Sequence, residues 1–107
     1  MFYTNETDIY LTRGDTANFH LDILDGENEY VLKESDILTL TVKKNAKQEK
    51  VYLKVYGDNS GNFTILPSQT KNMYFGEYEY DIQLYINERE VYTVIPVSKF
   101  TVLKEIS

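Results

Sequence analysis

The sequence predicts an all-β fold: an antiparallel β-sandwich of about seven to nine strands, in a single domain that spans residues 1–107. Apolar and polar residues alternate with a period of two from one end of the chain to the other, while no stretch keeps a helical apolar stripe for three turns. The aromatic residues are ten tyrosines and five phenylalanines, with no tryptophan, and tyrosine is favoured on half-buried pleated surfaces. These observations together indicate strands joined by short loops.

The first strand is expected to begin with Ile9 and Leu11 and to be interrupted at Gly14 and Asp15. The next strand places four apolar residues on one face, namely Ala17, Phe19, Leu21 and Ile23. A turn is predicted at residues 25–28, followed by a short apolar piece at 30–32. The remaining strands are expected at residues 37–44, 51–56, 63–65, 78–86 and 91–103.

The connections are predicted from turn-forming and charged residues. The lysine-rich stretch 43–50 and the glycine-containing stretch 57–61 are expected to be solvated loops. Pro67 ends the strand before it, and residues 68–73 have the length of one helical turn, which suits a crossover between sheets. Pro96 is expected to bend the last strand.

The net charge of −6 and the isoelectric point near 4.7 argue against nucleic acid and anionic membranes as partners. The absence of cysteine excludes a disulfide framework and thiolate metal sites. The N-terminus lacks the basic and apolar regions of a signal peptide, so the chain is expected to start out in the cytoplasm, although a virion or another assembly could carry it elsewhere.

No grouping of residues predicts catalysis, so we expect no enzyme activity, no catalytic or cofactor-binding residues and no metal ligands. His20 is alone and faces outward by parity. Arg13, Gly14 and Asp15 match an integrin-binding tripeptide, but Gly14 and Asp15 are better explained as structural turn residues. Acidic loops such as 58–62 fail the EF-hand pattern, although a weak surface calcium site built by neighbouring loops stays an alternative.

Two surfaces are candidates for an interface. Tyr52 and Tyr56 share a parity opposite to the apolar residues of their strand, so this row faces either solvent, a partner or other parts of the same chain. The last strand has no charged residue from Val91 to Val97, and its residues Val91, Tyr92 and Val94 are candidates for an exposed edge.

The segment from Leu66 through Gly76 to Tyr78 and Tyr80 resembles the approach to strand F in immunoglobulin and fibronectin type III domains. The resemblance implies an immunoglobulin-like sandwich, in which Tyr78 is a corner tyrosine that bonds upstream backbone and Tyr80 points into the core. The chain departs from antibody domains because it lacks their cysteine pair and core tryptophan.

Five segments, LTRGDTANFHLDI, ESDILTLTVKK, ILPSQT, GEYEYDIQL and KFTVLKEI, resemble small structural proteins encoded by phages and prophages of Gram-positive bacteria, in particular the N-terminal domain of the phage baseplate upper protein. The resemblance implies a non-catalytic structural module of a tail or baseplate assembly, which packs against copies of itself or against other tail proteins. The tyrosine surplus supports an alternative, a carbohydrate-binding or adhesin-like sandwich.

Overall fold

The computed structural model describes residues 2–87 and 89–105, and the fold is mostly β with one short helix. The elements in chain order are β1 (Phe2–Asn5), β2 (Asp8–Thr12), β3 (Ala17–His20), β4 (Leu24–Asp25), β5 (Asn28–Glu29), β6 (Ile37–Lys43), β7 (Val51–Tyr56), β8 (Asn62–Ile65), α1 (Pro67–Thr70), β9 (Gly76–Ile86) and β10 (Glu90–Leu103). None of the helices in the described part of the chain is long and apolar enough to cross a membrane.

The main sheet has six strands in the order β1-β2-β10-β9-β6-β7 and curls into a half-barrel. Its pairs are antiparallel except for β2 and β10, which run parallel, with Ile9 beside Phe100 and Thr12 beside Leu103. The expectation of a wholly antiparallel arrangement is therefore wrong. Period-two alternation states which face a side chain occupies, but it does not state the direction of the neighbouring strand.

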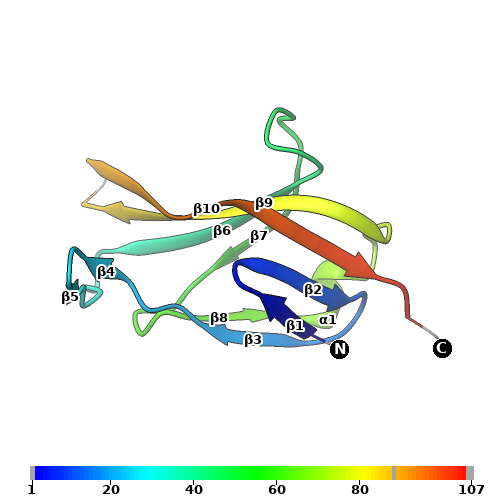
Figure 1. The fold of residues 1–107 in the computed structure, drawn as a ribbon, viewed down its shortest axis with the longest axis horizontal. Coiled ribbons are helices and arrows are strands. Elements are labelled where there is room, and N and C mark those ends of the chain that lie inside the picture. The colour runs from blue at the N-terminus through cyan, green and yellow to red at the C-terminus, as the bar shows by residue number, and fades with distance from the viewer. Residues whose placement is uncertain (1, 88, 106–107) are drawn as a thin grey trace.

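The smaller β3–β8 sheet lies across from the main sheet, and the β4–β5 hairpin extends from it at one end of the molecule (Figure 1). The tip of the β9–β10 hairpin lies at the same end, whereas α1 and the last residues of β10 lie at the other. Alternation in β3 and β8 explains the two-layer arrangement. Ala17, Phe63 and Ile65 are buried, while Asn18, His20 and Thr64 are exposed.

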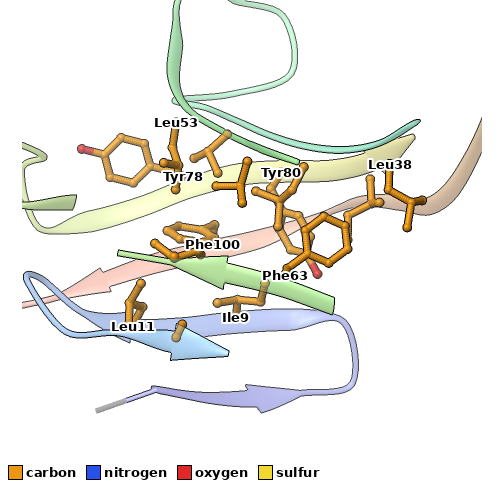
Figure 2. Packing of buried hydrophobic residues seen from close by; sticks show 14 of the residues in the cluster. Ile9, Leu11, Leu38, Leu53, Phe63, Tyr78, Tyr80 and Phe100 are labelled. Atoms are coloured by element: carbon orange, nitrogen blue, oxygen red, sulfur yellow. The ribbon is translucent and has the colours of Figure 1, made fainter. Parts of the chain in front are cut away.

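The core fills the space between these layers, as Figure 2 shows for eight labelled side chains. Its largest members come from β2, β6, β8, β9 and β10, and include Leu11, Leu40, Phe63, Ile82 and Phe100. Burying side chains of this size contributes about 1.5–3 kcal/mol each, so the alternating positions are the main source of stability. The alternation expected for these strands places Leu38, Leu40 and Val42 of β6 and Tyr78, Tyr80, Ile82, Leu84 and Ile86 of β9 on the core face, and all of them are buried except Ile86, which is partly buried.

Some local expectations differ from the structure. Residues 30–32 form no strand, and the short strands β1, β4 and β5 bring the number of described strands to ten. The turn at 25–28 joins β4 to β5 with Gly26 at a φ of 66°. The predicted helical turn exists as α1, which begins one residue earlier than expected because proline is well tolerated in the first turn of a helix.

Bulges shape two strands of the main sheet, β10 and β7. In β10, the pairing with β9 shifts between Thr93 and Ile95 and again between Ile95 and Ser98, and the second shift contains the predicted bend at Pro96. In β7, Val42 pairs with Leu53 and Lys43 with Val51, so Tyr52 is an extra residue. This bulge changes the parity of β7, which matters for the candidate interface residues.

Candidate functional site

The N-terminal half of β10 is a free sheet edge. β10 pairs with β9 from Glu90 to Val102, but it pairs with β2 only from Phe100 to Leu103. Where β2 begins, the Asp8 carboxylate accepts a hydrogen bond from the Lys99 N–H at 2.9 Å. Within the described residues, no strand pairs with the outer side of β10 between Glu90 and Lys99. The backbone groups along such an edge can pair with an added strand.

A groove runs beside this edge, between the β9–β10 hairpin and the segment that leads into β4. Its volume is about 690 Å³, which is enough for several side chains. Residues from the segment 22–25, from Tyr30 and Lys33, and from both strands of the hairpin line it. Its apolar lining consists of Ile23, Leu24, Leu84, Ile86, Tyr92 and Val94.

The rim of the groove is acidic. Asp22, Asp25 and Glu90 contribute three carboxylates to its lining, against one ammonium group from Lys33. The Tyr92 hydroxyl donates a hydrogen bond to Glu90 Oε2 at 2.7 Å, and this bond, with the nearby carboxylate charges of Glu90 and then Asp25, raises the pKa of Tyr92. The groove therefore presents a negative potential to anything that enters it.

One wall of the groove is held by a hydrogen bond from Tyr30 to Asp36. The Tyr30 hydroxyl donates to Asp36 Oδ2 at 2.7 Å, and the Lys33 N–H donates to the same oxygen at 2.9 Å. Asp36 is buried, and its Oδ1 has no hydrogen-bond partner within the described part of the chain. The bond to Asp36 is the largest of the causes that raise the pKa of Tyr30 to about 12. These bonds fix the position of the Tyr30 ring on the groove wall.

The structure separates the five candidate interface residues. Tyr92 and Val94 line the groove. Val91, the residue before Tyr92 in β10, pairs with Tyr85 of β9 and is exposed. On β7, at another edge of the sheet, Tyr56 is 61% exposed.

Tyr52 does not form an exposed row with Tyr56. Because it is the extra residue of the β7 bulge, its ring packs against Tyr78 with the centroids 5.2 Å apart and the planes at 66°. The Lys50 ammonium lies 4.7 Å from the Tyr52 ring centroid. Tyr52 is half-buried, and of the two interpretations the structure favours coverage by the same chain for this residue.

The Arg13-Gly14-Asp15 tripeptide forms a tight turn between β2 and β3. Gly14 has a φ of +83°, and its N–H donates to Thr70 Oγ1 at 2.9 Å, while the Asp15 N–H donates to the Thr12 carbonyl at 3.0 Å. Arg13 Nε donates to both carboxylate oxygens of Glu105, at 3.1 and 3.2 Å, and this bond lowers the pKa of Glu105. The tripeptide is thus tied into the fold.

Tyr78 and Tyr80 lie in the core at the start of β9. The Tyr78 hydroxyl donates to the Tyr74 carbonyl at 2.8 Å, which is the upstream backbone bond that a corner tyrosine makes. The Tyr80 hydroxyl donates to the carbonyl of Thr7, and its ring meets Phe100 edge to face with the centroids 6.1 Å apart. Burial raises the pKa of Tyr80 to about 12, with a smaller contribution from the Asp8 carboxylate.

His20 and the loop before β8 form a second polar cluster. His20 Nδ1 lies 2.9 Å from Asn62 Oδ1, and Nε2 lies 2.9 Å from Asp22 Oδ1. Asp58 Oδ1 accepts hydrogen bonds from the backbone N–H groups of Ser60 and Asn62, both at 2.9 Å, and these bonds lower the pKa of Asp58. The alternating polar residues of the loop thus form a local turn.

A smaller hollow of about 190 Å³ lies on the outer face of β6 and β9. Its charged lining is Lys43, Glu79 and Asp81, and burial raises the pKa of Asp81 while Lys43 opposes the shift. Across the residues that the structure describes, no group of three or more histidine, cysteine, aspartate or glutamate residues could hold a metal ion.

The groove itself could not be predicted from the sequence. Its acidic rim combines the turn at residues 25–28 with the turn before β10, which are more than sixty positions apart. The first of these was predicted only as a local turn, and only the fold places the two at the same end. Comparison with known proteins assigns no relative: no family model matches the chain, and no curated protein matches it.

Proposed function

We propose that this protein is a non-catalytic interaction module that binds a partner protein through the free edge of β10 and the groove beside it. The observation that carries the proposal is the stretch from Glu90 to Ser98, whose outer side pairs with none of the described strands and which is next to a groove with an apolar lining. An added strand would gain backbone hydrogen bonds from the edge, and its side chains would gain burial from the groove.

The exposed side chains of this edge are those that interfaces favour. Tyr92 is 51% exposed and Val91 and Val97 are similar, so about half of each side chain is available for further burial. Tyrosine and apolar residues are enriched in the buried centres of protein interfaces, and charged residues are depleted there. The stretch from Val91 to Val97 contains no charged residue.

We further propose that the fold is an immunoglobulin-like sandwich. Four observations support this: the main-sheet order β10-β9-β6-β7, the opposing β3–β8 pair, the short helix before β9 and the Tyr78 to Tyr74 bond. In immunoglobulin nomenclature these strands would be G, F, C and C′ in one sheet and B and E in the other. The curled sheet and the parallel β2–β10 pair distinguish the chain from a plain antiparallel sandwich.

The proposed setting is a phage or prophage tail or baseplate, with the partner being another protein of that assembly or a second copy of this chain. The support for this setting is the resemblance of the five sequence segments to phage structural proteins. An exposed edge is a liability for a free protein, because it can pair with other chains, and an assembly that covers it removes that liability.

The test is a binding measurement between the purified chain and the separately purified products of the flanking genes, with mass photometry of the chain alone at micromolar concentration. Two proline variants make the test specific to the edge. From Glu90 to Thr93, the N–H groups of successive residues point alternately towards β9 and towards the free edge of β10. Of Val91→Pro and Tyr92→Pro, one therefore removes a donor that faces β9 and the other removes a donor that faces the free edge.

Of the two variants, the one that removes an outward N–H should keep its melting temperature and lose partner binding, whereas the other should lose stability by breaking the pairing with β9. A chain that stays monomeric and binds none of these proteins would contradict the proposal. Partner binding that survives in the folded proline variant would contradict the β10 edge as the binding surface.

Carbohydrate binding is the second candidate. The exposed Tyr56 ring favours it, with the Lys54 ammonium 5.8 Å from its centroid. The packing of Tyr52 against Tyr78 weakens it, because the two tyrosines of β7 do not form one flat platform. A glycan array with Tyr56→Ala as the test variant and Tyr52→Ala as the comparison would separate the two functions.

A further inference from the structure

We infer that the groove beside β10 accepts an extended peptide segment that is apolar and basic, supplied by a partner protein and added as a strand to the β10 edge. The inference rests on the proposed interaction function and specifies the chemistry of the partner. Three features of the groove carry it: the free edge, the apolar lining and the acidic rim.

The free edge selects the backbone conformation of the occupant. A strand pairs with another extended segment about 4.8 Å away, because only that geometry meets its N–H and C=O groups in register. Helical or polyproline segments do not offer such a ladder. The regular pairing of Glu90 to Thr93 with β9 keeps the outer groups of β10 in line along this stretch.

The lining selects apolar side chains on one face of the occupant. In an extended segment, alternate side chains point to the same face, so every second residue would enter the groove. There they would meet Leu84 and Val94 from the hairpin and Ile23 from the opposite wall. Leu84 and Ile23 are already buried, whereas Leu24 and Tyr92 remain exposed and would be covered by the added strand.

The rim selects basic side chains. Asp22 and Asp25 come from one wall and Glu90 from the other, so lysine or arginine residues beside the apolar positions would meet carboxylates from both walls. The raised pKa of Tyr92, caused by its bond to Glu90 and by the charges of Glu90 and Asp25, agrees with a negative potential there. Charge complementarity of this kind mainly adds specificity and speed of association.

The same charges argue against a second copy of the chain as the occupant. The β10 stretch that would pair with itself contains Glu90 and no basic residue before Lys99, and the whole chain carries a net charge of −6. Two identical acidic rims facing each other would repel. The partner is therefore expected to be a different protein with a basic extended segment.

The experiment uses the whole chain, labelled for NMR, which suits a protein of 12.5 kDa. The probe is a synthetic peptide of about ten residues, composed of valine, threonine and lysine with period-two alternation. The matched peptides replace every lysine with glutamate, or replace alternate residues with proline so that no ladder can form. Amide shifts and hydrogen exchange along β10 report where each peptide binds.

We expect the lysine peptide to shift amides of β10 and of residues 22–25 and to protect outward amides of β10 from exchange, with affinity that falls as salt is added. The double variant Asp25→Asn/Glu90→Gln should weaken this binding roughly tenfold. The control Glu49→Gln/Glu77→Gln removes the same amount of charge from exposed positions outside the groove lining and should bind as the parent chain does.

Three outcomes would overturn the inference: no shifts with the lysine peptide, equal binding of the glutamate peptide, or shifts confined to β7 and the lysine-rich loop. Dimerisation of the chain through β10 would also overturn it, in favour of a second copy. A negative result for the basic peptide can be told apart from a negative result for the proposed interaction function. If the folded proline variant still abolishes binding of a natural partner while the lysine peptide does not bind, the β10 interface stands and only its charge preference is wrong.

Discussion

Leu21 and Gly61 are in backbone contact between the end of β3 and the start of β8. The Leu21 N–H donates to the Gly61 carbonyl at 2.8 Å, and Gly61 has a φ of +85°. A Cβ atom added to Gly61 would lie 2.5 Å from the Leu21 carbonyl oxygen. The contact therefore demands glycine for two reasons, the backbone conformation and the lack of space.

Gly61→Ala is expected to destabilise the fold by roughly 2–4 kcal/mol, because left-handed strain adds to the displacement of the Leu21 backbone. Gly14→Ala is the matched control. Gly14 has a similar φ of +83°, but no atom of the described residues lies within 4 Å of an added Cβ, so strain alone should cost about 1–2 kcal/mol. Urea denaturation of both variants checks the difference, and equal losses would show that the Leu21 contact is loose.

Tyr30→Phe removes a bond to the buried Asp36 carboxylate and should destabilise the fold by about 1–3 kcal/mol. The cost arises because Asp36 Oδ2 keeps only the Lys33 N–H while Oδ1 already lacks a partner in the described structure. Tyr56→Phe, at an exposed position, is the control and should change little. Thermal denaturation followed by circular dichroism gives the comparison, and a Tyr30→Phe variant as stable as the control would contradict the role of the bond.

The fold should lose stability in alkali through Tyr80. Its pKa is raised to about 12 in the folded state, from 10.0, so the folded state disfavours the phenolate. The resulting stabilisation is fully present below pH 10 and is lost as the pH rises towards about 12. A titration of tyrosinate absorbance should show a late component to which both Tyr30 and Tyr80 contribute, and this component should be smaller in Tyr80→Phe. A variant with an unchanged late component would exclude Tyr80 as its source.

His20 should titrate above its ordinary pKa, because the protonated ring donates hydrogen bonds to Asn62 Oδ1, the larger cause, and to Asp22 Oδ1. The raised pKa means that its contribution to stability is complete below the unfolded pKa of about 6.5 and disappears as the pH rises through the folded value. NMR titration of the ring protons measures the pKa. Asn62→Ala should lower it and Asp22→Asn should lower it by less, and an insensitive pKa would rule out both bonds as its cause.

The alternating pattern predicted the buried faces of β6 and β9 because each is a regular strand in the interior of a sheet. Leu40 and Ile82, for example, pair directly and are both buried. The same argument failed at Tyr52, since one extra residue in β7 reverses parity for everything on one side of it. A bulge depends on how two strands pair, and one strand's sequence does not contain that information.

The candidate site was predicted in part. A run without charges identified Val91 to Val97 as an edge, because charged residues normally protect exposed edges. The groove beside it was missed, since Asp25 and Glu90 meet only when the β4–β5 and β9–β10 hairpins reach the same end of the molecule. Local propensity describes each hairpin, whereas their meeting depends on the topology of the whole sheet.

The parallel pairing of β2 with β10 sets the order in which the domain can be completed during synthesis. Asp8 and Lys99, which begin this contact, are 91 positions apart, so a ribosome delivers β2 long before it delivers the segment that β2 must meet. Until then the one described strand that can pair with β2 in its native register is β1. A nascent chain of this domain therefore contains β2 before its parallel neighbour β10 exists. The full pairing of β2 with β10 forms only after Leu103 has left the exit tunnel.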